Sequence, residues 1–133
     1  MIYKAFLSLS MILGAMLVSV PPAYAAGSAQ EAATAAQHAS FAAKSPTIQQ
    51  VHMHLHHAVN CLVGPNGAGF DSGQANPCAG QGNGAIPDAV APARKQHLED
   101  ALAVAKSGLA TNDIEAAHQA ATDAYNLLSN PME

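Results

Sequence analysis

Histidine is the residue type in this chain that most directly suggests chemistry. The 133 residues include seven histidines but only five lysines and arginines together. A neutral imidazole ring is the commonest side-chain ligand for metal ions in proteins. Four of the seven rings fall within residues 52–57, which read HMHLHH. This concentration predicts a metal site, and the spacing of the rings decides which of them can share an ion.

The histidines of residues 52–57 divide between two flanks of a predicted helix. With 100° per residue and Leu55 at the centre of the buried face, His52 and His56 lie on one flank. Residues i and i+4 are neighbours on a helix surface, so these two rings can reach one ion. His54 and His57 lie on the opposite flank.

Three further histidines supply partners from the other predicted helices. His38 and His52 are each seven residues from a turn near Ser45, which predicts the same height on neighbouring antiparallel helices. In the second hairpin, His97 and His118 differ in their distance from the turn by three residues, or ~4–5 Å along the helix axis. We therefore expect one histidine from each helix to meet at the middle of the bundle. The alternative is that the rings lie on polar flanks and bind no metal.

The only two cysteines, Cys61 and Cys78, are expected to form a disulfide in an oxidising compartment. On the chain-entropy model such a bond stabilises the fold by ~3 kcal/mol. Cys61 is expected on the flank of its helix rather than in the core, so that the bond holds a loop beside His54 and His57. The alternative is a pair of free thiolates that bind a metal together with His57.

The N-terminus is typical of a secretory signal peptide. Lys4 precedes an apolar run over residues 5–20, and residues 21–25 (PPAYA) end in a small-x-small cleavage site. A membrane anchor is the alternative, but the apolar run is shorter than the ~20 residues that span a bilayer. We expect cleavage after Ala25 and a periplasmic or secreted product, residues 26–133, with no further membrane segment.

Four helical segments are predicted in the remaining chain, and no strand pattern competes with them. They cover residues 28–44, 46–63, 88–106 and 113–129, and a Gly/Asn/Pro-rich loop spans residues 64–87. Ser107-Gly108 is expected to end the third helix, and Thr111-Asn112-Asp113 to cap the fourth. Two helical hairpins joined by a long loop predict an all-α, antiparallel four-helix bundle. The inward positions expected at helical spacing are Ile48, Val51, Leu55, Ala58, Val59, Leu62, Leu98, Ala101, Leu102, Ala105, Ile114, Ala117, Ala121, Tyr125 and Leu128.

Several function classes are disfavoured by the composition. A formal net charge of −4 argues against nucleic-acid binding, which needs a clustered basic patch. No serine or cysteine has a recognisable base and orienting group, so we expect no enzyme. Residues 115–118 (EAAH) match half of a di-iron motif, but only Glu31 remains as an inward acid. Covalent haem attachment is excluded because the chain has no Cys-x-x-Cys-His.

The C-terminal hairpin resembles the small periplasmic metal-binding protein family of histidine-rich helical bundles. The resembling residues are 97–102 (HLEDAL) and, after a glycine-containing turn, 117–121 (AHQAA). That family binds divalent transition metals, copper among them, through histidines repeated along its helices. The resemblance implies that His97 and His118 are ligands.

The sequence departs from that family where further histidines would stand, because Val104 and Tyr125 occupy those positions. We therefore expect one defined site rather than high metal capacity. The expected function is metal handling by an exported protein that binds a divalent transition metal. Copper is the favoured ion, and zinc or nickel could bind to the same rings. The alternatives are a structural or protein-interaction bundle without metal, and non-covalent haem binding. The candidate ligands are His38, His52, His54, His56, His57, His97 and His118.

Overall fold

The computed structural model describes residues 22–130, with side chains from Gly27 onward. Within this range the chain forms four helices and no strand: α1 Pro22–Ala42, α2 Ile48–Val63, α3 Pro92–Leu109 and α4 Ile114–Ser129. The predicted all-α four-helix bundle is confirmed. Most of the predicted leader lies outside the described residues, and α1 begins three residues before the predicted cleavage position. Between residues 22 and 130, no helix has the length and apolarity needed to cross a membrane.

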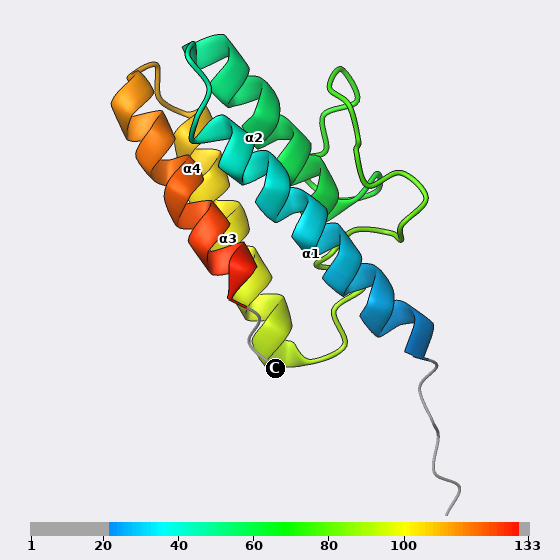
Figure 1. The fold of residues 1–133 in the computed structure, drawn as a ribbon. Coiled ribbons are helices and arrows are strands. Elements are labelled where there is room, and N and C mark those ends of the chain that lie inside the picture. The colour runs from blue at the N-terminus through cyan, green and yellow to red at the C-terminus, as the bar shows by residue number, and fades with distance from the viewer. Residues whose placement is uncertain (1–21, 131–133) are drawn as a thin grey trace, which may run out of the picture.

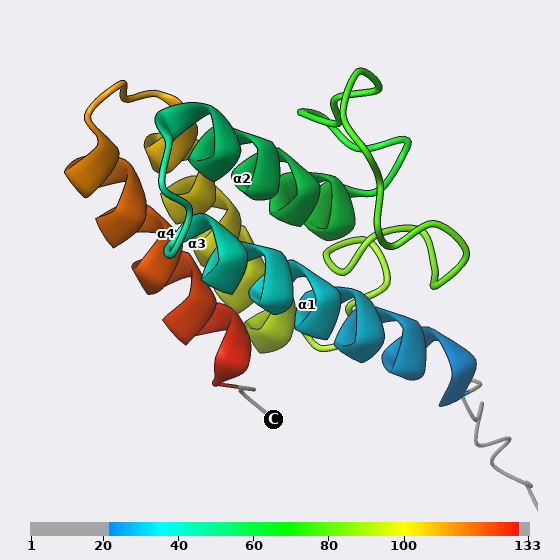
Figure 2. The same cartoon turned by 45° about the horizontal axis from the view of Figure 1, so that its top comes forward.

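The two hairpins, α1–α2 and α3–α4, pack antiparallel and side by side (Figures 1 and 2). Helix α1 contacts both α2 and α4, and α3 contacts α4 and α2. The α1–α2 turn and the α3–α4 turn lie at the same end of the bundle, as predicted. The long connection after α2 (green in Figure 1) extends from the other end and lies beside α1 and α2.

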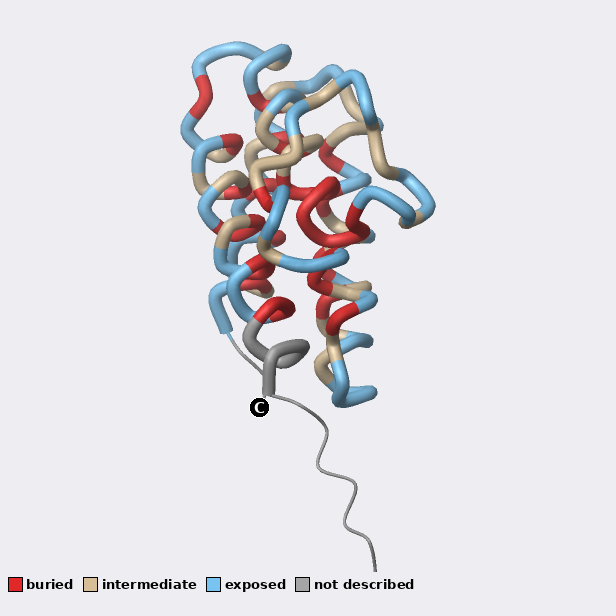
Figure 3. The backbone as a smooth tube through the Cα atoms, turned by 90° about the vertical axis from the view of Figure 1, so that its right-hand side faces the viewer, coloured by how far each residue is buried: buried red, intermediate tan, exposed pale blue. Residues whose placement is uncertain are grey.

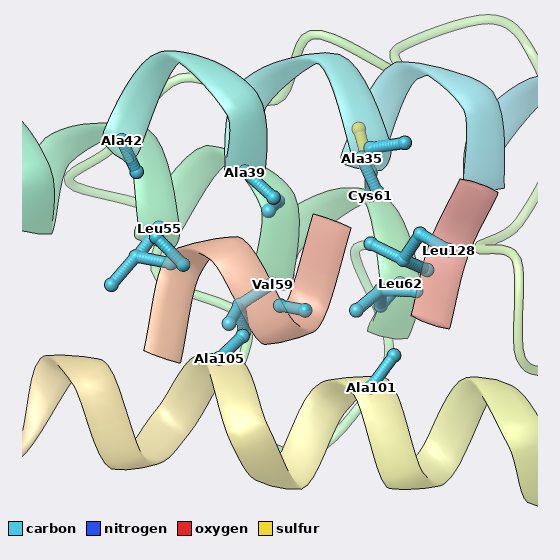
Figure 4. Packing of buried hydrophobic residues seen from close by; sticks show 14 of the residues in the cluster. Ala35, Ala39, Ala42, Leu55, Val59, Cys61, Leu62, Ala101, Ala105 and Leu128 are labelled. Carbon is cyan, nitrogen blue, oxygen red and sulfur yellow. The ribbon is translucent and has the colours of Figure 1, made fainter. Parts of the chain in front are cut away.

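The core is built from small side chains, so the helices approach closely. Figure 4 shows Ala35 and Ala39 of α1 facing Leu62 and Val59 of α2, with Ala101 and Ala105 of α3 on the other side. Buried and exposed stretches alternate along the helices, as expected when one face of each helix is turned toward the core (Figure 3). The predicted apolar stripe of α2 is confirmed, with Ile48 half-buried at its start.

Helix α4 differs from the prediction at Tyr125, which is 40% exposed. Its buried face is made instead by Ala117, Ala121 and Ala124, each fully buried. A phenol ring does not fit between helices whose contact surfaces are mostly alanine, so the smaller Ala124 takes the inward position and Tyr125 turns outward.

Two predicted boundaries of α3 are wrong, each for a local reason. The helix begins at Pro92 rather than Asp88, because proline suits the first helical turn and Asp88 instead accepts hydrogen bonds from Asn83. It also continues past Gly108 to Leu109. A Cβ on Gly108 would lie 2.7 Å from Leu55 Cδ1, so this glycine permits close packing of α3 on α2 rather than ending the helix.

The connection between α2 and α3 is ordered by polar anchors. The fully buried Asn60 side chain donates to the carbonyls of Asp71 and Ala75 and accepts from the Asp71 amide at 2.8 Å. The amides of Ala85 and Ile86 donate to the last carbonyls of α2, each at 3.0 Å. These bonds satisfy the end of the helix and hold the connection against it.

The predicted Cys61–Cys78 disulfide is present, with a Cα–Cα distance of 5.2 Å, and no free cysteine remains among the described residues. Its expected location was wrong in one respect. Both residues are buried, because the loop folds over the flank of α2 and makes that flank interior. The Cys78 sulfur also approaches the Glu31 carbonyl at 3.6 Å, so the bond lies between the loop, α2 and α1.

Candidate metal centre

Three histidines from the α1–α2 hairpin form a compact group on the flank where the two helices meet. His38 comes from α1, and His54 and His57 come from α2, one turn apart. One nitrogen from each ring lies within 4.8 Å of the other two, and His38 Nδ1 is 3.3 Å from His54 Nδ1. We call these three residues the histidine trio. It is the only group of three or more potential ligands in the described part of the chain.

The spacing within the histidine trio suits a single ion. Two imidazole nitrogens bound tetrahedrally at 2.0–2.1 Å from zinc lie ~3.3 Å apart. The His38–His54 pair already has this separation. The His57 ring centroid lies 5.0 Å from that of His38 and 5.8 Å from that of His54, so side-chain rotation brings its nitrogen into range. All three side chains are half-buried, so water reaches part of the group.

The environment keeps the three rings neutral. Burial lowers the pKa of His38 to about 4, with smaller contributions from the neighbouring rings of His57 and His54. Burial also lowers the pKa of His54, and burial followed by the charges of His54 and His56 lowers that of His57. A neutral imidazole has a free lone pair, which a metal ion requires of a histidine ligand.

Hydrogen bonding leaves part of the trio unsatisfied. The Nδ1 atom of His57 is buried and has no partner among the described residues. A buried polar atom without a partner costs free energy. Phe41 packs against two of the rings, with centroids 5.6 Å from His38 and 5.4 Å from His54, and remains 43% exposed. Phe41 therefore shields one side of the trio from water.

The other four histidines are engaged elsewhere, and the predicted mid-bundle cluster of one histidine from each helix is not formed. The rings of three of them each pair with a backbone carbonyl: His52 Nε2 with Thr111 O at 2.8 Å, His97 Nε2 with Leu127 O at 2.6 Å, and His118 Nε2 with Ser45 O at 2.8 Å. A carbonyl only accepts, so these nitrogens carry the hydrogen.

His56 faces the loop, with its Nδ1 3.5 Å from Asp71 Oδ2. The loop closed by the disulfide therefore contacts His56 through Asp71. His52 and His56 share a flank, as expected, but each ring has a different partner.

The error in the predicted ligand set concerns which flank of α2 faces which neighbour. The spacing of 100° per residue assigns His52 and His56 to one flank and His54 and His57 to the other, but it does not determine the handedness of the bundle. In the structure α1 lies on the flank of His54 and His57, and the α3–α4 turn lies on the flank of His52. His38 consequently meets His54 and His57.

Comparison of the chain with protein-family models, with curated proteins and with solved structures finds no match in any of the three. The resemblance of the C-terminal hairpin to the small periplasmic metal-binding family therefore stays a prediction. The chemistry of the site is argued below from its own geometry.

Proposed function

We propose that the protein binds one divalent transition-metal ion through His38, His54 and His57, in the service of metal handling outside the cytoplasm. The observation that carries the proposal is the convergence of three neutral imidazoles, one of them with a buried nitrogen that has no partner. The predicted leader and the buried disulfide support export, since disulfides persist in oxidising compartments.

The histidine trio would lower the stability of a bundle whose role was purely structural. Three partly buried imidazoles with lowered pKa values make the fold less stable in acid, and the unpartnered His57 nitrogen adds to the cost. Apolar side chains on the same flank would avoid both costs. Metal binding accounts for the arrangement, because three deprotonated ligands on two packed helices need little reorganisation to take an ion.

Copper is the favoured ion, because nitrogen ligands bind Cu(II) most tightly among the first-row divalent metals. Zinc and nickel suit the same rings, and three histidines with an open fourth position is a familiar zinc ligand set. The role proposed is binding and transfer of the ion.

Calorimetric titration of metal-free protein with Cu(II) and with Zn(II) at neutral pH tests the proposal. Two double variants on the same helix provide a matched comparison: His54→Ala with His57→Ala, and His52→Ala with His56→Ala. We expect one ion per chain for the natural protein and for the second variant. The first variant should lose affinity by more than the ~10–100-fold that removal of an outer-shell partner costs.

Equal affinity of the two double variants would contradict the proposal, and so would binding no stronger than that of an unrelated protein with as many histidines. Loss of affinity only in the His52/His56 variant would return the site to the other flank of α2. A Soret band on addition of haem, abolished by the His54/His57 variant, would favour haem as the ligand.

A further inference from the structure

A second group of potential ligands lies where the loop crosses the first half of α1. Glu31 of α1 is 1% exposed and Asp88, just before α3, is 6% exposed. Glu31 lies two turns of α1 before His38, which is ~10 Å along the helix axis. Two buried carboxylates close together are costly unless something positive lies between them.

The two carboxylates converge on one point beside Gly82. The position that a Cβ would take on Gly82 is 2.3 Å from Asp88 Oδ2 and 3.0 Å from both Glu31 Oε1 and Oε2. The Gln81 carbonyl is nearby, because a Cβ on Gly27 would lie 3.2 Å from both that oxygen and Asp88 Oδ2. Three carboxyl oxygens therefore gather around Gly82, and Asp88 Oδ2 and the Gln81 carbonyl both face Gly27.

The available hydrogen-bond donors do not satisfy this group of oxygens. Glu31 Oε1 accepts the Gly84 amide at 2.8 Å, and Asp88 accepts the amide and side chain of Asn83 at 2.9 and 3.1 Å. Glu31 Oε2 is buried and has no partner among the described residues.

No lysine or arginine in the described range pairs with either acid. The guanidinium closest in sequence, that of Arg94, donates instead to the side chain and carbonyl of Ser28, at 3.3 and 3.5 Å. The charge of the two carboxylates is left without a counter-charge from the protein.

We propose that Glu31 and Asp88 bind a hard divalent cation, of which calcium fits best. Calcium takes carboxylate and carbonyl oxygens at 2.3–2.6 Å in flexible geometry and accepts water for the remaining positions. Gly82 and Asn83, which border the two acids, are exposed, so only the loop separates the group from solvent. A cation of charge two would neutralise both carboxylates and give Oε2 a partner. It would tie residues 81–88 to α1, next to the point where the disulfide ties Cys78 to α2.

This site is chemically distinct from the histidine trio. Its donors are all oxygen, which favours calcium, whereas imidazole nitrogens favour later transition metals. A proton is the competing occupant, since burial and the neighbouring Asp88 raise the pKa of Glu31. The two occupants respond differently to calcium and to acid, so they can be told apart.

Calorimetric titration with CaCl2 at neutral pH, together with thermal unfolding with CaCl2 or with EDTA, tests the proposal. We expect one Ca2+ per chain and a melting temperature that rises with the calcium concentration. Glu31→Gln keeps the shape and the bond from the Gly84 amide but removes the charge, so it should abolish both effects; Asp88→Asn should do the same. His38→Ala is the matched control on α1 and should leave the calcium response unchanged, while Glu31→Gln should leave Cu(II) binding unchanged.

A natural protein that binds no calcium would overturn the proposal, whether or not the variants fold. Calcium binding that survives in Glu31→Gln would overturn it as well. The site would be assigned to a proton if calcium left the melting temperature of the natural protein unchanged while a fall in pH below neutrality raised it. In that case Glu31→Gln should lose the rise with falling pH. Each of these results stands independently of whether the histidine trio binds its ion.

Discussion

The α3–α4 hairpin uses its histidines only as structural donors, whereas the α1–α2 hairpin has one such ring, that of His52, and three rings that face one another. In the α3–α4 hairpin, His97 and His118 donate to the backbone carbonyls of Leu127 and Ser45 and serve as structural hydrogen-bond donors. In the α1–α2 hairpin, the histidine trio has no backbone partner, and its rings face one another with lowered pKa values. The number of histidines in a chain therefore does not identify a metal site, whereas the hydrogen-bond partner of each ring shows which histidines are free to bind an ion.

The same hairpin that carries the unsatisfied groups also carries the covalent link. Both His57 Nδ1 and Glu31 Oε2 are buried without partners, and both belong to α1 or α2. The disulfide joins α2 to the loop and reaches the α1 backbone. The fold concentrates destabilising polar groups in one region and places its strongest constraint in that same region.

The largest expected effect comes from removing this constraint. Replacing Cys61 and Cys78 together by alanine should lower the free energy of unfolding by ~3 kcal/mol on the chain-entropy model for a bond that closes a short loop. That corresponds to a fall of roughly 10–20 °C in melting temperature for a domain of this size. Thermal unfolding followed by circular dichroism measures it.

Limited proteolysis of the same variant sharpens the comparison between the hairpins. Cleavage should appear first within residues 64–87, because the loop loses its link to α2, and the α3–α4 hairpin should remain resistant. A variant as stable as the natural protein, or one first cleaved between α3 and α4, would show that the constraint lies elsewhere.

The fold was largely predictable from the sequence, because the signals that determine it are local. The apolar stripe of α2, the Asp113 cap of α4 and the pairing of the only two cysteines all follow from spacing and residue type. The cap forms as expected, with Asp113 Oδ1 accepting from the Glu115 amide at 2.9 Å.

The candidate site was predictable only in kind. All three members of the trio were among the predicted ligands, but His38 was paired with the wrong flank of α2, because sequence spacing does not determine bundle handedness. The loop anchors were missed for a related reason. Asn60 is on a polar flank of α2 and becomes buried only when the loop covers it, and nothing in the spacing of the chain indicates that coverage.

Removing a structural histidine should have an intermediate effect. His118→Ala leaves the Ser45 carbonyl without its donor and should cost ~1 kcal/mol of unfolding free energy in metal-free protein. His38→Ala removes a ring with no backbone partner and should cost less. Urea unfolding of the two variants with EDTA present measures the difference, and a larger loss for His38→Ala would break the distinction between the two groups of histidines.

The dependence of stability on pH should give the smallest effect, because the rings of the trio are partly exposed and water screens them. Their folded pKa values lie below the ordinary value of 6.5, that of His38 at about 4. Between these values the unfolded state binds more protons, so the stability contributed above pH 6.5 is lost as the pH falls toward 4. The dependence of unfolding free energy on pH in metal-free protein should be flatter over this window in His38→Ala than in the natural protein, and an unchanged dependence would contradict the assignment.

The most direct test of the central claim is a nuclear magnetic resonance spectrum of the imidazole nitrogens with and without one equivalent of Zn(II). Zinc is diamagnetic, so each ring can be followed individually. We expect ring nitrogens of His38, His54 and His57 to move to metal-bound shifts, while the backbone-paired rings of His97 and His118 keep their hydrogen on Nε2. Shifts confined to His52, His56, His97 and His118, or no shift in any ring of the trio, would contradict the account.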